Sequence, residues 1–458
     1  MESSTPFGNS ASVFEWISSF INFERDLSSK SFRLNRMMRL AELADHPELC
    51  APAVHVAGSK GKGSVTGMAA AILEAGGIRT SRYASPHVSD FRERISLGNR
   101  FFDESLYAHG GNALRAVTET MIKEGNEPTY FELMTMWFFL VSRISGSGAM
   151  AVETGLGGRL DATNILDPVV SAITVIELEH TETLGDTLEA IAGEKAGIIK
   201  KGKPLVLAEQ NSKALEVFKQ KAREQKSPFL YFPEWGTISH LRISSQGTTF
   251  NLKLKNPGKT QSMRRGDPVI LEDLHIPIPG EIQAANAGLA VLAVKTAFPG
   301  IPDGAVRKGL EGFTIPARFE GLRSSPAFII DGAHTARSIA ECIKTFTCLY
   351  GEKGLLLFGC ASGKDVHSMA ETLVPHFSRI IITTPGTFKK SNPMEVYSVF
   401  AGEGKKAGNS PDIAFCPGTA QAIDLALKIS AENGIPALGA GSFYLAAEIR
   451  LRISGKDA

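Results

Sequence analysis

A glycine-rich stretch at residues 58–64 has the composition of a phosphate-binding loop. It reads GSKGKGS, so three glycines and two lysines fall within seven positions. Backbone N–H groups of such a turn can hold phosphate oxygens at the positive end of a following helix, where Lys62 can reach the β- and γ-phosphates and Ser64 can bind Mg²⁺. The spacing departs from the pattern G-x-x-x-x-G-K-[ST], because Gly63 separates Lys62 from Ser64. A tight turn of small residues is the alternative, and two lysines inside the turn make it less favourable.

Three further polar residues lie at or just beyond the ends of strand-like runs. Ser85 ends IRTSRYAS, Glu153 ends AMAVE, and His180 follows AITVIELE. Because ligands of open α/β sheets bind at the carboxyl ends of the strands, these side chains are expected at the edge that carries the glycine-rich loop. A hydroxyl, a carboxylate and an imidazole can together ligate a divalent metal beside a triphosphate. Taken singly, Glu153 also fits a solvated loop, and His180 fits a hydrogen-bonded structural histidine.

The sequence DGAH at residues 331–334 follows another apolar run, AFII. Asp331 and His334 place a carboxylate and an imidazole three residues apart at the end of a predicted strand. They are expected to face the first domain across a cleft, and clefts between domains are favoured ligand sites. The alternative is a plain turn, for which Asp-Gly is a common signal.

The elements expected around these residues alternate between strand and helix. A strand over 52–58, a helix over 64–77 and a strand over 78–85 form a βαβ unit, which predicts a mostly parallel sheet. Thr129 and Glu132 form a T-x-x-E capping box ahead of an apolar helix. Further strands are expected over 149–153, 169–177 and 203–208, further helices over 12–21, 32–44, 187–200 and 281–298, and an inserted antiparallel hairpin over 236–254.

The segment 312–322, GFTIPARFEGL, carries a proline between patterned regions and is expected to join two domains. The predicted fold class is α/β. Residues 1–314 are expected to form an ATP-binding domain of the P-loop mononucleotide type with a mostly parallel sheet. Residues 315–458 are expected to form a smaller, Rossmann-like α/β domain. Its expected strands lie in AFIIDGAH, GLLLFGCASG, RIIITTPG and IPALGAGS.

The composition narrows the functional classes. The chain has 458 residues and a formal net charge of +1, so neither a nucleic-acid nor a membrane partner is expected. Five scattered cysteines predict neither a disulfide framework nor a zinc site. No apolar run approaches the roughly 18 residues of a membrane span, and the N-terminus lacks a signal-peptide pattern. A cytoplasmic protein is therefore expected.

Taken in order, these motifs resemble the Mur ligase superfamily, in particular its folylpolyglutamate synthase/dihydrofolate synthase branch. The branch has G-T-N-G-K-G-S where this chain has GSKGKGS, and T-S-P-H followed by D-F-x-E-R-I where it has ASPHVSDFRERI (84–95). The most specific match is ETGLGGRLDATN (153–164), against E-x-G-L-G-G-R-L-D-A-T-N. Further matches, which extend the resemblance to about residues 15–450, are EHTETLGDT (179–187), EKAGIIK (194–200), ARFE (317–320), DGAHT (331–335) and GSFY (441–444).

The resemblance implies a two-domain, ATP- and Mg²⁺-dependent amide ligase, with K⁺ as a further cation. ATP would phosphorylate a carboxylate, and the amine of L-glutamate would attack the resulting acyl phosphate. The acceptor would be dihydropteroate, the γ-carboxyl of a folylglutamate, or both. A carboxylate resists amines until its oxygen becomes a good leaving group, so positioning and charge neutralisation carry most of such catalysis. The branch also tends to be monomeric.

The resemblance assigns roles residue by residue. The ATP-binding residues would be Gly58, Ser59, Lys60, Gly61, Lys62, Gly63, Ser64, Asn286, Arg318 and Asp331. The metal would be held by Ser64, Ser85, Glu153 and His180. The catalytic residues would be Lys195, His180, Asp331 and His334. Lys195 matches a lysine that is carbamylated in the family, which requires a depressed lysine pKa; an ordinary surface ion pair with Glu194 is the alternative.

Four positions depart from the family's motifs. Lys60 replaces Asn, Glu179 replaces Asp, Ala317 replaces Gly and Thr335 replaces Asn. The phosphate and metal residues are intact, so these departures bear on the acceptor substrate more than on the reaction. Two other functions stay open: a Mur-type ligase that acts on a different carboxylate, and a nucleotide-binding ATPase or regulator without ligase activity. An ATPase activity independent of any amino acid would favour the latter.

Overall fold

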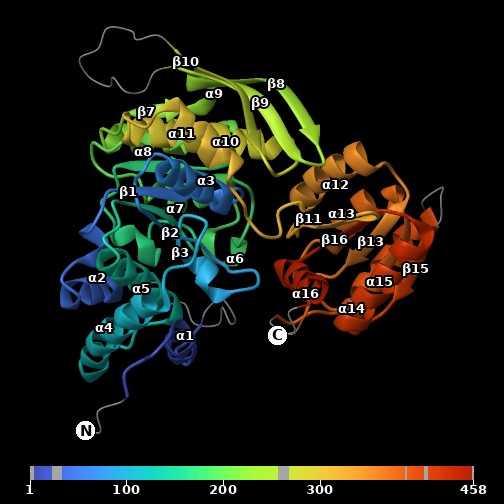
Figure 1. The fold of residues 1–458 in the computed structure, drawn as a ribbon, viewed down its shortest axis with the longest axis horizontal. Coiled ribbons are helices and arrows are strands. Elements are labelled where there is room, and N and C mark those ends of the chain that lie inside the picture. The colour runs from blue at the N-terminus through green and yellow to red at the C-terminus, as the bar shows by residue number, and fades with distance from the viewer. Residues whose placement is uncertain (1–4, 23–33, 256–267, 387–388, 407–410, 456–458) are drawn as a thin grey trace.

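The chain folds around three β-sheets, arranged in Figure 1 as a larger N-terminal part and a smaller C-terminal part. The structure is a computed structural model that describes residues 5–22, 34–255, 268–386, 389–406 and 411–455. No helix within these ranges is long and apolar enough to cross a membrane. All five cysteines are free thiols, as the sequence predicts.

The first sheet has seven strands in the order β3-β2-β4-β1-β5-β6-β7. All neighbouring strands are parallel except β3, which runs antiparallel to β2 at one edge. This confirms the predicted, mostly parallel sheet and places β1 at its centre. The strands are β1 (Ala53–Ala57), β2 (Thr80–Tyr83), β3 (Ile95–Leu97), β4 (Ala149–Glu153), β5 (Val170–Ile173), β6 (Leu205–Leu207) and β7 (Phe229–Tyr231).

Helices cover both faces of this sheet. Alternate residues of β1 join opposite cores: Val54 and Val56 pack with helices on one face, and Ala53 and Ala57 with helices on the other. The first face carries α3 (Lys62–Ala75), α10 (Glu281–Ala297) and α11 (Asp303–Glu311). The other face carries α1 (Ser10–Ser18), α2 (Leu34–Leu43), α4 (Glu104–Lys123), α5 (Tyr130–Ile144), α7 (Leu188–Ala196) and α8 (Ser212–Glu224). β1 is therefore buried along its whole length, and His55 is the one polar residue in its sequence AVHVA.

The predicted helices are present with shifted ends. The capping box of α5 is confirmed, since Thr129 accepts from the backbone of Glu132 and Glu132 returns the contact. The helix expected over 187–200 ends as α7 at Ala196, and residues 32–33 of the helix expected over 32–44 lie outside the described residues. The remaining short helices are α6 (Thr181–Leu184), α9 (Phe232–Trp235), η1 (Pro47–Leu49), η2 (Phe91–Arg94), η3 (Ala162–Ile165) and η4 (Val374–His376).

The predicted hairpin is part of a separate three-stranded antiparallel sheet. Its strands are β8 (Gly236–Ser244), β9 (Gly247–Leu254) and β10 (Val269–Ile276), in the order β10-β9-β8. The sequence did not predict β10, which lies beyond the undescribed residues 256–267. Phe250 and Leu252 of β9 pack into the same core as α10, which attaches this sheet to the first domain.

The third sheet has six strands in the order β11-β12-β16-β13-β14-β15, all parallel except β11 against β12. They are β11 (Glu320–Ser324), β12 (Ala327–Ile330), β13 (Gly354–Phe358), β14 (Phe377–Ile382), β15 (Asp412–Phe415) and β16 (Ala437–Ala440). The four predicted strands are confirmed, and the half-exposed β11 and β15 were not predicted. The covering helices are α12 (Ala336–Tyr350), α13 (Val366–Leu373) and α14 (Pro393–Lys406) on one face, and α15 (Thr419–Asn433) and α16 (Phe443–Ser454) on the other.

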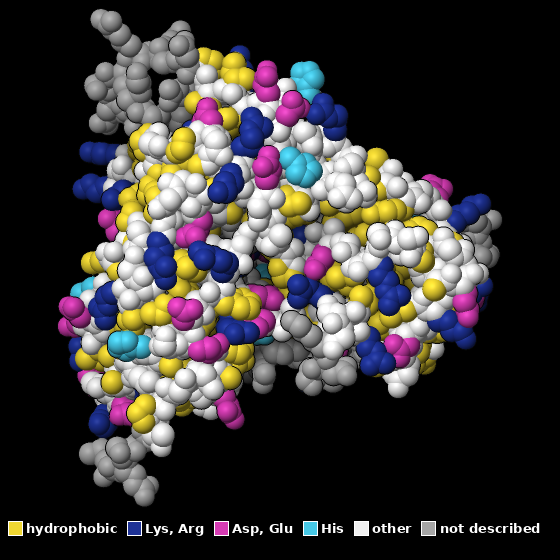
Figure 2. Space-filling view, viewed as in Figure 1, with side chains coloured by type: hydrophobic (Ala, Val, Ile, Leu, Met, Phe, Trp, Pro, Cys, Tyr) yellow, Lys and Arg dark blue, Asp and Glu magenta, His cyan; other side chains and the backbone are white. Residues whose placement is uncertain are grey.

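Residues 312–319 join α11 to β11 and so connect the first sheet to the third. The division at residues 314 and 315 stays a prediction. Two ion pairs bring the parts together beside this connection: Arg337 of α12 lies 3.4 Å from Glu177, and Lys344 lies 2.6 Å from Glu281. Figure 2 shows the surface hollowed where the two parts meet.

Candidate active site

The glycine-rich loop joins β1 to α3 at the centre of the first sheet. A Cβ atom on Gly58 would collide with Thr174 beyond β5, and a Cβ atom on Gly61 would lie 2.5 Å from Oδ1 of Asn286 on α10. Gly58 and Gly61 also have φ angles of +142° and +88°, which L side chains rarely adopt. Both positions therefore require glycine, and Asn286 lies directly against the loop.

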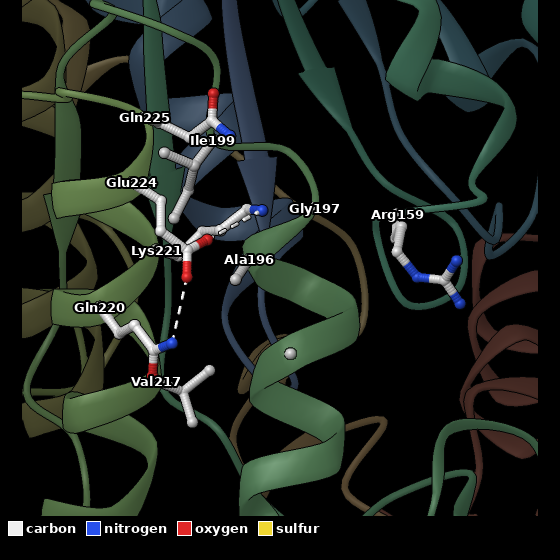
Figure 3. A pocket seen from close by; sticks show the side chains of 10 residues that line it. Arg159, Ala196, Gly197, Ile199, Val217, Gln220, Lys221, Glu224 and Gln225 are labelled. Carbon is white, nitrogen blue, oxygen red and sulfur yellow. Dashed lines mark hydrogen bonds and ion pairs between the residues drawn. The ribbon is translucent and has the colours of Figure 1, made fainter.

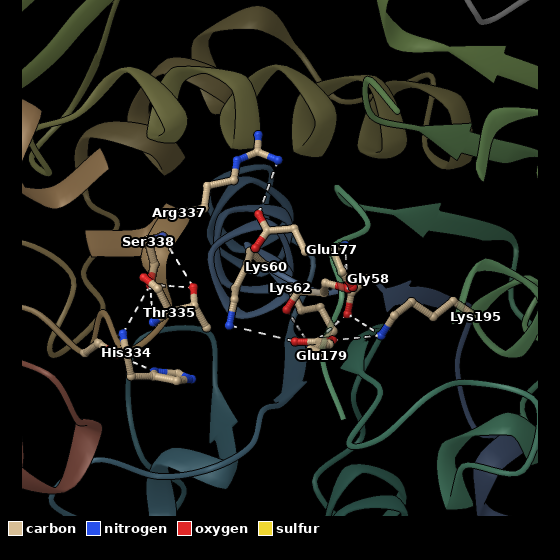
Figure 4. A network of polar contacts seen from close by, with 12 residues as sticks. Gly58, Lys60, Lys62, Glu177, Glu179, Lys195, His334, Thr335, Arg337 and Ser338 are labelled. Carbon is tan, nitrogen blue, oxygen red and sulfur yellow. Dashed lines mark hydrogen bonds and ion pairs between the residues drawn. The ribbon is translucent and has the colours of Figure 1, made fainter. Parts of the chain in front are cut away.

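Two lysines donate to the carbonyl groups of this loop (Figure 4). Nζ of Lys62 lies 2.9 Å from the oxygen of Gly58 and 3.3 Å from that of Ser59. Nζ of Lys195, which reaches across from α7, lies 2.9 Å from the same Gly58 oxygen. Two ammonium groups thus converge on the point where the chain leaves β1.

Glu179 is the carboxylate that opposes these lysines. Its Oε1 lies 3.1 Å from Nζ of Lys195, and its Oε2 lies 3.8 Å from Nζ of Lys60. Burial raises the pKa of Glu179, but Lys62, Lys195 and Lys60 outweigh it and hold that pKa at about 2. Glu179 is therefore ionised throughout the neutral range. Sequence analysis named it only as a departure from the family, yet it connects three lysines from two segments.

Lys195 is buried, with 1% of its surface exposed. Burial and the neighbouring Lys62 lower its pKa to about 8, against the opposing effect of Glu179. About a tenth of such a side chain is the neutral amine at pH 7. The alternative of an ordinary surface ion pair with Glu194 or a neighbour is wrong, because Lys195 is buried and pairs with Glu179, while Glu194 pairs with Arg159 at 2.8 Å.

The predicted metal ligands Glu153 and Ser85 lie next to each other. Glu153 ends β4 in a buried position, and its Oε2 accepts from the backbone N–H of Ser85 at 3.3 Å. Burial raises the pKa of Glu153, and Lys62 opposes that rise. Oγ of Ser64, in the first turn of α3, is buried without a hydrogen-bond partner. An orphaned hydroxyl close to a buried carboxylate fits a Mg²⁺ site beside phosphate.

His180 stands at the start of α6 with a φ angle of +48°. Burial, reinforced by Lys62, lowers its pKa to about 4 despite the raising effect of Glu179, so its imidazole is neutral at pH 7 and has a lone pair for a metal. The described residues contain no group of three or more His, Cys, Asp and Glu side chains that could hold a metal by themselves. A metal site shared by Ser64, Ser85, Glu153 and His180 thus stays a prediction. Such a site would need the serine hydroxyl groups and phosphate oxygens as ligands beside Glu153 and His180.

In the C-terminal part, Asp331 and Arg318 lie at the entry to the third sheet. Asp331 follows β12 and accepts from the backbone N–H groups of Phe319 at 2.8 Å and Ala333 at 2.7 Å. Burial raises the pKa of Asp331, and Arg318 opposes that rise. The guanidinium of Arg318 lies over the ring of Phe443, 4.2 Å from its centroid. Its charge also acts on Glu153 of the first sheet.

His334 follows Asp331 on the same loop. Its Nδ1 lies 2.7 Å from the carbonyl oxygen of Gly332, so this nitrogen carries the proton and Nε2 is left as an acceptor. Burial, followed by the charges of Lys60 and Lys364, lowers the pKa of His334 to about 3. The loop of the first domain and His334 of the second are therefore close enough to interact electrostatically.

Two departures from the family's motifs have structural explanations. Thr335 is the N-cap of α12, where its side chain accepts from the backbone N–H of Ser338. Ala317 is fully buried with a φ angle of +54°, a conformation that favours the glycine it replaces.

Three site residues were not predicted from the sequence. Glu177 and Arg337 pair across the two parts, and Oγ of Ser59 in the loop accepts from the backbone N–H of Glu177 at 3.0 Å. Lys364 follows β13, and its charge acts on Glu179. Its position after the predicted strand GLLLFGCASG was a usable signal, because ligands gather at such strand ends.

A surface groove of about 390 Å³ lies apart from this loop, between α7 and α8 (Figure 3). It is lined by Ala196 and Gly197 on one side and by residues such as Val217, Gln220 and Lys221 on the other. None of the predicted site residues lines it. The candidate site is therefore the junction of the two parts and not this groove.

Comparison with known proteins agrees with the fold and identifies the family. Models of the Mur ligase middle domain and of the Mur ligase glutamate ligase domain match residues 56–294 and 317–443. The chain therefore belongs to the Mur ligase family. A dihydrofolate synthase/folylpolyglutamate synthase of Bacillus subtilis (strain 168) is 29% identical over 429 residues, which cover 92% of this chain and 94% of that protein.

A probable dihydrofolate synthetase of Schizosaccharomyces pombe is 32% identical over 319 residues, 68% of this chain and 71% of that protein. A solved folylpolyglutamate synthase of Mycobacterium tuberculosis, complexed with ADP and AMPPCP, superposes with a TM-score of 0.83 at 25% identity, covering 98% of this chain and all of that one. Within the Mur ligases, the chain belongs to the folylpolyglutamate synthase/dihydrofolate synthase branch.

Proposed function

We propose that the protein is an ATP-dependent ligase that joins L-glutamate to a folate-type carboxylate, either dihydropteroate, a folylpolyglutamate or both. The observation that carries this proposal is that charged and polar side chains from both parts of the chain meet at their junction. Lys60 and Lys62 come from the glycine-rich loop, and Arg318 and His334 come from the C-terminal part. The names of the relatives and the nucleotides bound to the solved relative support it.

The reaction needs an anionic site with fixed donors. An acceptor carboxylate oxygen bonds to the γ-phosphorus of ATP as ADP leaves, and the glutamate amine then attacks the acyl carbon and expels phosphate. In this proposal the loop backbone, Lys62 and Asn286 hold the nucleotide, while Arg318 neutralises charge from the opposite side. The low pKa of His334 makes it a weak base, so its role is hydrogen bonding through Nε2 more than proton transfer.

Cation and lysine chemistry form part of the same proposal. Ser64, Ser85, Glu153 and His180 would hold Mg²⁺, which neutralises phosphate charge when bound, and K⁺ is a further candidate cation. The neutral amine of Lys195 would add to the carbon of CO₂ and release one proton, which gives a carbamate anion. Its depressed pKa of about 8 favours this addition. We further expect a cytoplasmic enzyme that acts as a monomer.

The test is a ligation assay with purified protein, ATP, Mg²⁺ and L-glutamate, in which dihydropteroate and a folylglutamate are supplied separately. We expect glutamate-dependent ADP release and a product heavier by one glutamyl residue with at least one acceptor. ADP release that needs no amino acid would indicate a plain ATPase. Glutamate-dependent release that appears only with another carboxylate would indicate a different Mur-type ligase.

A further inference from the structure

Lys60 occupies a different place from the other lysine of the loop. Lys62 folds back onto the carbonyl groups of Gly58 and Ser59, whereas Lys60 forms an ion pair only with Glu179, at the long distance of 3.8 Å, among the described residues. Figure 4 shows its side chain extending from the loop between Glu179 and His334. One fifth of the Lys60 side chain is exposed. Its ammonium group therefore lies at the junction of the two parts and is only weakly paired.

Positive charge exceeds negative charge around Lys60. The charges of four lysines act on the single carboxylate of Glu179: Lys60, Lys62, Lys195 and Lys364. Glu177, the other carboxylate near Lys60, is paired with Arg337. Burying unpaired cations costs free energy unless an anion joins them. The arrangement is therefore complete only when an anionic ligand is present.

The position of Lys60 indicates which part of that anion it meets. Backbone N–H groups at the start of α3 are suited to the inner phosphates, because they lie inside the turn. Lys60 lies within the turn, but its side chain points away from the start of α3 toward His334 of the C-terminal part, on which its charge acts together with that of Lys364. In the proposed reaction the terminal phosphoryl group is the one that moves from the nucleotide toward an acceptor at this junction.

We propose that Lys60 binds the terminal phosphoryl group of ATP, and not the inner phosphates or the glutamate, by exchanging Glu179 for phosphoryl oxygens. This inference rests on the proposed function and deepens it. Lys62 and the loop backbone hold the part of the nucleotide that ADP retains, whereas Lys60 contributes only while a γ-phosphoryl group is present. Glu179 keeps Lys60 in place in the free enzyme.

The test compares two nucleotides in the Lys60→Asn variant. Dissociation constants of ADP and of AMPPCP, a non-hydrolysable ATP analogue, are measured by calorimetry in the presence of Mg²⁺. A charge-assisted hydrogen bond is worth roughly a 10- to 100-fold change in affinity. We expect AMPPCP to bind at least about 10-fold more weakly, ADP to change by less than about twofold, and the KM for glutamate to stay unchanged. Lys201→Asn removes the same charge from an exposed turn and is the matched control.

Each other outcome overturns the assignment. Equal weakening of ADP and AMPPCP would mean that Lys60 serves the inner phosphates or the fold of the loop. A rise in the KM for glutamate alone would identify the amino acid as its partner, and no change in any constant would leave Lys60 without a ligand. Lys60→Met separates loss of charge from any contact made by the Asn amide. Nucleotide binding needs no acceptor, so the two proposals can fail separately. If Lys60→Asn weakens AMPPCP but not ADP while the wild-type protein ligates no folate, the proposed function is contradicted and the role of Lys60 is not.

Discussion

Replacing Gly61 with alanine tests whether the glycine-rich loop is held in a strained conformation. Gly61 has a φ angle of +88°, and a left-handed backbone costs an alanine about 1–2 kcal/mol. The new Cβ would lie 2.5 Å from Oδ1 of Asn286, which must move. That movement breaks the bond from Nδ2 of Asn286 to Gln283, which is 3.3 Å long and worth about 1 kcal/mol. Together, Gly61→Ala should destabilise the first domain by about 2–3 kcal/mol.

Differential scanning calorimetry measures this loss. The transition of the first domain should fall by roughly 3–5 °C, given an unfolding entropy of about 2.1 cal/mol/K per residue over roughly 300 residues. Gly63→Ala, two residues away, is the matched control. Its Cβ would lie 3.5 Å from Glu153 and Ile315, an ordinary contact, and alanine favours a helix more than glycine does by about 1 kcal/mol. That variant should melt at or above the wild-type temperature.

A double variant separates the two causes. Asn286→Ala removes the atom that Gly61→Ala would meet, so the pair should lose less than the sum of the single variants by about 1 kcal/mol. The remaining loss reports the backbone strain. The reasoning is refuted if Gly61→Ala melts within 1 °C of wild type, or if Gly63→Ala loses as much as Gly61→Ala.

Three other predictions follow from the charges of the site and the core. A carbamate on Lys195 should give a ¹³C NMR signal in protein treated with ¹³C-bicarbonate, rising from pH 7 to pH 9 as the amine with a pKa of about 8 loses its proton, and absent in Lys195→Arg. Burial lowers the pKa of His55 to about 3, so below pH 6.5 the unfolded chain takes up a proton that the folded chain refuses. Stability should therefore fall by up to about 1.4 kcal/mol per pH unit from this residue between pH 6.5 and 4, and urea midpoints should show a smaller slope for His55→Gln. Arg337→Ala and Glu177→Gln should each weaken the contact between the two parts by about 0.5–1 kcal/mol and raise the radius of gyration in X-ray scattering, with no further rise in the double variant.

The local signals of the sequence predicted the fold well wherever one segment decides its own structure. The βαβ unit at residues 52–85 and the capping box at Thr129 depend on neighbouring residues, and both are present. The strands that were not predicted depend on pairing with another strand. β10 pairs with β9 across residues 256–267, and the half-exposed β11 is held by its antiparallel pairing with β12. Their own apolar patterns are too weak to indicate a strand.

The same contrast, between local features and features that depend on distant residues, applies to the candidate site. Spacing and residue type were sufficient to name the loop lysines and Glu153, and the family resemblance named Lys195. They were not sufficient to find that Glu179 is the common partner of Lys60 and Lys195, which are 135 residues apart in the chain. The pKa of about 2 for Glu179 and that of about 8 for Lys195 arise from burial and from charges that the fold brings close together. The Coulomb energy between such charges depends on their distance and burial, and neither quantity can be obtained from the sequence.

This dependence changes how the substitution of lysine for asparagine at position 60 is to be understood. As a sequence change it adds one positive charge to a phosphate loop that already has Lys62. In the fold the added charge lies opposite Glu179 and close to His334, whereas Lys62 points back onto the carbonyl groups of the turn. The substitution therefore extends the cationic surface toward the C-terminal part, where the phosphoryl group must be transferred, and this is why its effect should depend on the γ-phosphate and not on ADP.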